Sequence, residues 1–265
     1  MKRVFLPSVS LQIIDESYDS ILKQWDCNLK ESHGGFAVFL EANLLSLCLK
    51  NSEVRLCIQT ADWIFPDGVA VSRLAELQGG HPVERISGPT FFLKALDYGQ
   101  ERNWKHFLYG RTPESLCVLT EKLKQKFPRI QIVGSYAPPF RPLSPEEDAD
   151  VKLQINASHA DFLWVGLSGP KQELWIHAHQ KELAVPFLLG VGAAFDFHSG
   201  RRSWAPSFIR EIGMEWLWRA CSGGRKTFIR NLRCVSTVAF HLAQEWIRLK
   251  IQTGKNSVSS LSQNK

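Results

Sequence analysis

Short apolar segments alternate along the chain with segments of helical periodicity. Six apolar segments predict strands that are buried on both faces: 36–40, 63–65, 106–109, 130–135, 161–166 and 186–191. Helix starts are readable at Ser87, at Pro113-Glu114 and at Ser144-Pro145, where acidic residues follow in the first turn. Repeated strand–helix units predict an α/β fold, with a mostly parallel sheet covered by helices on both faces. Ligands of such sheets bind at the carboxyl ends of the strands.

Residues 201–265 have a different pattern. From Phe228 to Leu249, apolar residues recur at spacings of three and four, which predicts a long amphipathic helix. The Ser-rich segment 256–265 is predicted to be disordered. Residues 1–200 carry 20 basic and 23 acidic residues, a net charge of −3, whereas residues 201–265 carry 12 and 3, a net charge of +9. We therefore expect an α/β domain over 1–200 and a basic helical appendage over 201–265.

The appendage contains four of the nine tryptophans, at positions 204, 216, 218 and 246. Tryptophan is favoured at water–lipid interfaces, and clustered Lys and Arg attract anionic lipid, so this composition predicts docking to an anionic membrane surface. Two alternatives stay open. The helix could pack on the body with a basic solvent face, or the appendage could bind nucleic acid, which ranks lower because no known nucleic-acid-binding motif is present.

The composition is that of a soluble globular protein, with 44% hydrophobic and 22% charged residues. No apolar run reaches the length of a membrane-spanning helix, and the start of the chain, interrupted by Pro7, is not expected to be a signal peptide. The six cysteines show no CxxC pair, which argues against structural zinc and favours a reduced, cytoplasmic chain.

Three loops that follow predicted strands are candidates for chemistry, and Phe65-Pro66-Asp67-Gly68 is the first. A carboxylate at a strand end can act as a general base or bind a sugar hydroxyl. It can equally cap the helix expected over 69–77. The residues alone favour the capping role.

The second loop is Gly166-Leu167-Ser168-Gly169-Pro170-Lys171-Gln172-Glu173. Backbone N–H groups at a helix start near Pro170 suit a phosphate, and Lys171 and Gln172 add donors. The alternative is a tight connection with exposed polar residues. The serine does not form a hydrolase elbow, because proline occupies position 170, where that motif needs glycine.

The third loop, Gly190-Val191-Gly192-Ala193-Ala194-Phe195-Asp196, begins like a dinucleotide fingerprint. Phe195 replaces the third glycine, which argues against an NAD(P)-linked oxidoreductase, but a turn that approaches a phosphate stays plausible. Two weaker patterns are not expected to bind metal. Asp148-Ala149-Asp150 lies inside an acidic helix start, and His177 and His179 point in different directions on a helix.

Taken in order, these segments resemble the WecG/TagA/CpsF glycosyltransferases (glycosyltransferase family 26). The resemblance spans residues 35–235. The segments that carry it are Asn43, Pro66-Asp67-Gly68, Glu84-Arg85-Ile86-Ser87-Gly88, the loop 166–173, the loop 190–197 with Gly200, and Glu215-Trp216-Leu217.

The resemblance implies a Rossmann-like α/β fold and a bacterial, metal-independent, inverting transferase that needs no cofactor. Such an enzyme moves a sugar from a UDP-sugar donor to a polyprenyl-diphosphate-linked sugar acceptor, at the cytoplasmic face of the cell membrane, in the synthesis of cell-surface polysaccharides. N-acetylmannosamine, its uronic acid and glucose are the candidate sugars. A homo-oligomer is among the states that the sequence leaves open. From another functional class, a non-catalytic basic adaptor for membrane or nucleic acid stays the alternative.

The resemblance also assigns roles to residues. It places the catalytic base at Asp67, a key arginine at Arg85, a glutamine at Gln172 and the acceptor-side asparagine at Asn43, where Glu41 stands in place of the usual threonine. The expected substrate-binding set is Asn43, Gly68, Lys171, Gln172, Glu173, Gly190, Gly192, Asp196, Arg219, Arg225 and Arg230. In the appendage, Ser222-Gly223-Gly224 replaces the usual Glu-Pro turn, so the register of the three arginines is open.

Overall fold

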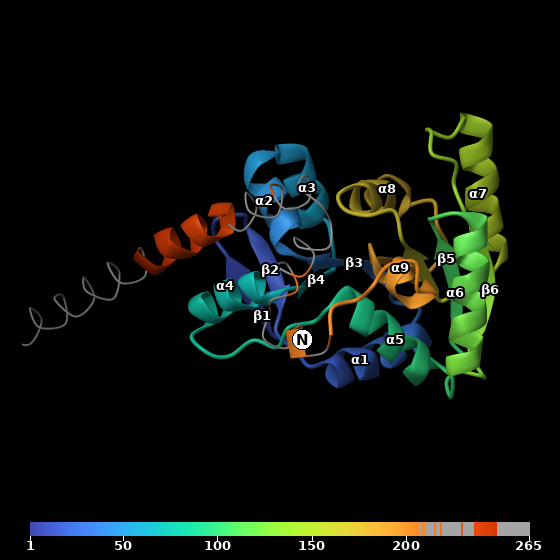
Figure 1. Cartoon of the computed structure of the whole chain (residues 1–265), viewed down its shortest axis with the longest axis horizontal. Coiled ribbons are helices and arrows are strands. Elements are labelled where there is room, and N and C mark those ends of the chain that lie inside the picture. Colours follow the sequence, from blue (N-terminus) through green and yellow to red (C-terminus); the bar gives the residue numbers. More distant parts are fainter. Residues whose placement is uncertain (207, 210–214, 216–217, 219–228, 230–235, 248–265) are drawn as a thin grey trace, which may run out of the picture.

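The computed structural model describes residues 1–206, 208–209, 215, 218, 229 and 236–247. The described residues form an α/β fold around one eight-stranded sheet, ordered β1-β2-β4-β3-β8-β7-β5-β6 (Figure 1). The strands are β1 Arg3–Leu6, β2 Leu11–Ile14, β3 Gly35–Leu40, β4 Trp63–Pro66, β5 Lys105–Tyr109, β6 Gln131–Tyr136, β7 Phe162–Val165 and β8 Phe187–Gly190. All neighbouring pairs are parallel except β1 and β2.

Helices cover both faces of the sheet (Figure 1). They are α1 Tyr18–Lys30, α2 Ala42–Lys50, α3 Ser52–Gln59, α4 Val69–Gly79, α5 Gly88–Gly99, α6 Pro113–Lys126, α7 Pro145–Ala157, α8 Lys171–His179 and α9 Ala194–Ser199. Side chains of α2, α3, α4, α7 and α8 pack on one face, and those of α1, α5, α6 and α9 pack on the other. The predicted fold class is therefore confirmed.

The central strands show why continuous apolar runs predicted them. In β7, Leu163 and Val165 belong to one core cluster, while Phe162 and Trp164 belong to the other. Both faces therefore need apolar side chains. The strand predicted over 130–135 is present as β6, but the expectation that it is buried on both faces was wrong, because β6 lies at the edge of the sheet and is only partly buried. The β1–β2 hairpin was not predicted at all.

The helix 236–247 of the appendage packs on the body. Residues 236–247 are helical, and Val238 is buried in the core cluster that includes α2 and α4. Lys50 Nζ donates to Thr237 Oγ1 at 3.2 Å, which ties this helix to the end of α2. No helix among the described residues is long and apolar enough to cross a membrane. The division at 200–202 into two domains stays a prediction.

Candidate active site

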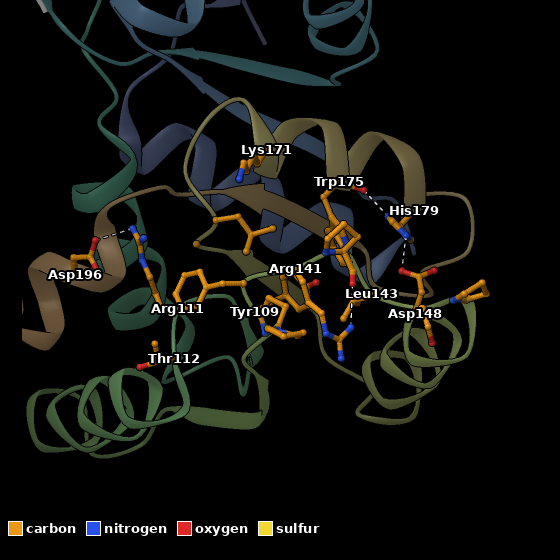
Figure 2. A pocket seen from close by; sticks show the side chains of 18 of the residues that line it. Tyr109, Arg111, Thr112, Arg141, Leu143, Asp148, Lys171, Trp175, His179 and Asp196 are labelled. Carbon is orange, nitrogen blue, oxygen red and sulfur yellow. Dashed lines mark hydrogen bonds and ion pairs between the residues drawn. The ribbon is translucent and has the colours of Figure 1, made fainter. Parts of the chain in front are cut away.

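A pocket of about 860 Å³ lies at the carboxyl ends of β5, β6 and β7 (Figure 2). Its wall includes Tyr109 at the end of β5, the segment 138–145 after β6, Gly166 after β7, and one face of α8. Lys171 and Asp196 line it, so the structure brings together two of the predicted substrate-binding residues there. This is the edge at which ligands of parallel sheets bind.

Four cationic side chains line the pocket: Arg111, Arg141, Lys171 and Arg201. Arg141 is paired with Glu147 through two hydrogen bonds. Arg111 follows β5 with a left-handed backbone, at φ 64°. Its Nη2 donates to the Gly192 carbonyl at 3.0 Å and lies 2.8 Å from Asp196 Oδ2. Burial lowers the pKa of the Arg111 guanidinium and the charge of Asp196 opposes this, so Arg111 stays cationic at neutral pH. The pocket is thus suited to an anionic ligand.

Stacked aromatic rings form another part of the wall (Figure 2). The Tyr109 and Trp175 rings lie 4.3 Å apart at an interplanar angle of 19°, and the Trp175 and His179 rings lie 4.6 Å apart at 23°. On the far side of Tyr109, the Tyr136 ring stacks at 5.9 Å. These rings stack on one another, and Trp175, which is only partly buried, presents aromatic surface against which a planar ring such as a nucleobase can pack.

Asp148 also lines the pocket, and its carboxylate is engaged by His179 and Lys152. His179 Nε2 lies 2.9 Å from its Oδ1, and Lys152 Nζ lies 2.9 Å from its Oδ2. Among the described residues, no group of three or more His, Cys, Asp or Glu is placed to hold a metal ion.

Asp67 and Arg85 form a separate cluster at the end of β4, and neither lines the pocket. Asp67 Oδ2 accepts a hydrogen bond from the Gly88 N–H, the first of α5, at 3.2 Å, and its Oδ1 lies 4.0 Å from Arg85 Nε. Arg85 Nη2 lies 3.1 Å from Oε2 of Glu215, beyond the predicted boundary at 200–202. The prediction that Asp67 caps the helix over 69–77 was wrong. Gly68, at φ 98°, is the N-cap of α4 and makes no side-chain hydrogen bond, whereas Asp67 accepts from the first N–H of α5.

Gln172 joins the loops that follow β7 and β8. Its Oε1 accepts from the Ser168 N–H at 3.1 Å and from the Gly192 N–H at 2.9 Å. Its Nε2 donates to Glu173 Oε1 at 2.8 Å. A Cβ on Gly190 would lie 2.9 Å from Gln172 Nε2, so glycine is required there. The structure therefore brings four predicted residues together, but it directs the Gln172 oxygen to backbone donors rather than into the pocket.

The loop after β3 explains the unusual residue at position 41. Glu41 is the N-cap of α2, and its carboxylate accepts from the Asn43 N–H at 2.9 Å and from the Leu44 N–H at 3.1 Å. Threonine also serves as an N-cap, so the local role is kept while the side chain becomes acidic. Asn43 lies in the first turn of α2, just after β3, the strand next to β4, and so at the carboxyl edge of the sheet.

Some predicted and some unpredicted residues complete the site. The appendage arginines Arg219, Arg225 and Arg230 lie outside the described residues. Sequence reasoning did not single out Arg111 or Trp175. The position of Arg111 directly after a buried strand was a usable signal, because carboxyl ends of strands carry ligands. Trp175 lies on a helix and had no comparable signal, since an aromatic residue there usually packs in the core.

The fold and the pocket define an α/β protein with a cationic, partly aromatic pocket at the carboxyl edge of its sheet. The chain belongs to the WecG/TagA/CpsF family of glycosyl transferases, whose model matches residues 8–252. A protein of Bacillus spizizenii is 28% identical over 214 residues, 80% of this chain and 81% of the relative. One of Staphylococcus aureus is 26% identical over 193 residues, 73% of each chain. Both relatives are named N-acetylglucosaminyldiphosphoundecaprenol N-acetyl-beta-D-mannosaminyltransferase. The family identified from the sequence is confirmed.

Proposed function

We propose that this chain transfers a sugar from a UDP-sugar to a polyprenyl-diphosphate-linked sugar, with inversion at the anomeric carbon. The names of the relatives suggest N-acetylmannosamine as the sugar and N-acetylglucosaminyl diphosphoundecaprenol as the acceptor. The observation that carries the proposal is the pocket, in which stacked aromatic rings and four cationic side chains occur together. A nucleoside diphosphate needs both.

The donor occupies the pocket in this proposal. The uracil ring stacks near Trp175, and the diphosphate meets Arg111, Arg201 and Lys171. Asp196 is held by Arg111 and is available to a ribose hydroxyl. β8 and β3 lie between β7 and β4, so about 14 Å of sheet separates the pocket from Asp67. An extended nucleotide sugar can reach across this distance.

The acceptor approaches from the β3–β4 side. Its hydroxyl oxygen attacks the anomeric carbon while the bond from that carbon to the phosphate oxygen breaks, and Asp67 takes the hydroxyl proton. One displacement of this kind inverts the anomeric centre. General-base catalysis contributes about 10²- to 10⁴-fold in rate. Asn43 is placed to orient the acceptor.

The departing UDP gains negative charge. We assign its stabilisation to Arg111, Arg201 and Lys171, which supply charge without a bound divalent ion. Transfer should therefore survive EDTA. A large loss of activity that Mg²⁺ or Mn²⁺ restores would contradict this assignment.

Membrane docking by the appendage is part of the proposal, because the acceptor is a lipid. The 236–247 helix buries Val238, yet its Phe240, Trp246 and Ile247 side chains are exposed. Exposed aromatic and aliphatic side chains of this kind suit a membrane interface. Exchanging Phe240 and Trp246 for Ser should weaken binding to anionic vesicles, whereas unchanged vesicle binding would remove this helix from the docking surface.

The direct test is product formation. The wild-type protein is incubated with UDP-N-acetylmannosamine, UDP-glucose or the UDP-linked uronic acid and with a short-chain polyprenyl-diphosphate N-acetylglucosamine. Mass spectrometry should detect one added sugar for one of the donors, and NMR of the product should show the inverted linkage. If no donor gives a product and UDP does not raise the melting temperature, the proposed function is wrong.

A further inference from the structure

Gln172 and Glu173 form a buried pair at the centre of the carboxyl edge. They lie at the start of α8, between the pocket on the β5–β7 side and the Asp67 cluster on the β4 side. Gln172 is 5% exposed and Glu173 is 1% exposed. Both side chains are therefore part of the interior rather than of the pocket wall. Their role must then be something other than direct contact with the UDP-sugar.

The orientation of the Gln172 amide is fixed by its neighbours. Two backbone N–H groups, of Ser168 and Gly192, point at one end of the amide, so that end must be the oxygen. Both residues have left-handed backbones, at φ 76° and 57°. The oxygen of Gln172 thus holds two turns, of which the one at Ser168 is costly to form alone because a non-glycine residue has a left-handed backbone there. The Gly192 carbonyl in turn accepts from Arg111.

Glu173 holds the other end of the same amide. Its Oε1 accepts from Gln172 Nε2 at 2.8 Å. Its Oε2 is buried and has no hydrogen-bond partner among the residues that the structure describes. A carboxyl group buried with one oxygen unpartnered is costly to keep. The hydrogen bond from Gln172 Nε2 to Glu173 Oε1 gives a reason for a carboxyl group at this buried position.

We propose that Glu173 is a positioning residue for sugar transfer: through the Gln172 amide it holds the β7–α8 and β8–α9 loops in register and so places Arg111 and the donor diphosphate. This inference rests on the proposed function and assigns one further residue to the same site. Glu173 itself touches neither donor nor acceptor.

The protonation state of Glu173 gives the proposal a distinctive signature. Burial raises the pKa of Glu173 to about 7, and the charge of Glu41 adds to this. The other titratable groups whose charges reach it are Cys48 of α2 and Cys57 of α3, and burial raises both thiol pKa values to about 12. Neither thiol ionises between pH 6 and pH 8.5. Ionised Glu173 needs donors for Oε2 and finds none among the described residues, so ionisation loosens the pair.

Two variants separate the hydrogen bond from the charge. Glu173→Gln keeps an oxygen that accepts from Gln172 and cannot ionise. Glu173→Met keeps a similar volume and removes the acceptor. Glu101→Gln, an exposed carboxylate paired with Arg129, is the matched control.

Hydrogen exchange at the Ser168 and Gly192 amides measures how firmly Gln172 holds them. The rates are corrected for the intrinsic effect of pH. Loss of one hydrogen bond predicts about tenfold faster exchange in Glu173→Met. In the wild type, exchange should rise between pH 6 and pH 8.5, and turnover should fall over the same range. Glu173→Gln should show neither change. Wild-type exchange in Glu173→Met, or the same pH response in Glu173→Gln, would overturn the proposal.

The hydrogen-exchange measurement requires neither the UDP-sugar nor the lipid-linked acceptor. It therefore tests the role of Glu173 independently of the proposed function. A wild-type protein that makes no product contradicts the proposed function, while the exchange comparison still decides the role of Glu173. If the wild type is active and Glu173→Met matches it in kcat and in exchange, only the positioning role fails. If Glu173→Met does not fold, the comparison of Glu173→Gln with the wild type across pH carries the test.

Discussion

The arginines at the two ends of the carboxyl edge have different numbers of carboxylate partners. In the pocket on the β5–β7 side, Arg111 pairs with one carboxylate, Asp196, and three more cationic side chains line the same pocket. On the β4 side, Arg85 lies between two carboxylates, Asp67 and Glu215. The first region has positive charge to offer to a ligand, whereas the second holds its positive charge among its own acidic groups.

This difference suits two halves of one transfer reaction. A nucleoside diphosphate needs uncommitted cations and a flat apolar wall, and a hydroxyl that is to lose its proton needs a carboxylate. Glu215 lies after residue 202 in the sequence, and its carboxylate pairs with Arg85. The acceptor half is therefore built from both the α/β body and the chain that follows it.

The largest effect should come from Asp67→Asn. The amide oxygen can still accept from the Gly88 N–H, so the fold should be kept, but the proton acceptor is lost. We expect turnover to fall by about 10²- to 10⁴-fold with UDP affinity unchanged, measured by product formation and by calorimetry. Asp97→Asn, an exposed site on α5, is the control. Near-normal turnover in Asp67→Asn would remove this residue from the base role.

Arg111→Ala should damage the other half. Losing a charge-assisted contact to the diphosphate predicts about 10- to 100-fold weaker UDP binding, while uridine binding changes little. Calorimetric titration of both ligands measures this. Arg129→Ala, in an exposed pair with Glu101, should bind UDP like the wild type. Equal losses for UDP and uridine would indicate a structural defect and not a lost phosphate contact.

Trp175→Leu should give the converse pattern in the same pocket. Removing a stacking surface predicts about tenfold weaker binding of both uridine and UDP, because both carry the base. If uridine binds the variant as well as the wild type, the base does not lie against this wall.

The smallest effect concerns the acceptor side. Glu41→Ala removes the N-cap of α2 and should cost about 1 kcal/mol in the free energy of unfolding, measured with urea. Glu41→Thr should restore most of this stability, because threonine also caps helices. A Thr variant as unstable as the Ala variant would show that the carboxylate does more than cap.

The sequence predicted the elements whose signals are local. Strands β3, β4, β5, β7 and β8 are continuous apolar runs, and α7 begins with the capping box of Ser144 and Glu147. The β1–β2 hairpin was missed because neither strand is a continuous apolar run: β1 alternates exposed and buried positions, and β2 is interrupted by the exposed Gln12.

The site depended on contacts that are distant along the chain. Asp67 bonds to Gly88, 21 residues away, so the choice between cap and base could not be settled from its own loop. Gln172 was expected to donate to the ligand, but its Nε2 donates to Glu173 and its oxygen accepts from Gly192, 20 residues on. Arg111 had no motif around it, and only the folded chain brings it beside Asp196.

The most direct test of the division into two halves is a crystal structure of the protein with UDP. We predict that the uracil lies against Trp175 and that the diphosphate lies within hydrogen-bond distance of Arg111. Asp67 should face the end of the diphosphate without contacting it. UDP bound beside Asp67 and Arg85, with the pocket on the β5–β7 side empty, would contradict it.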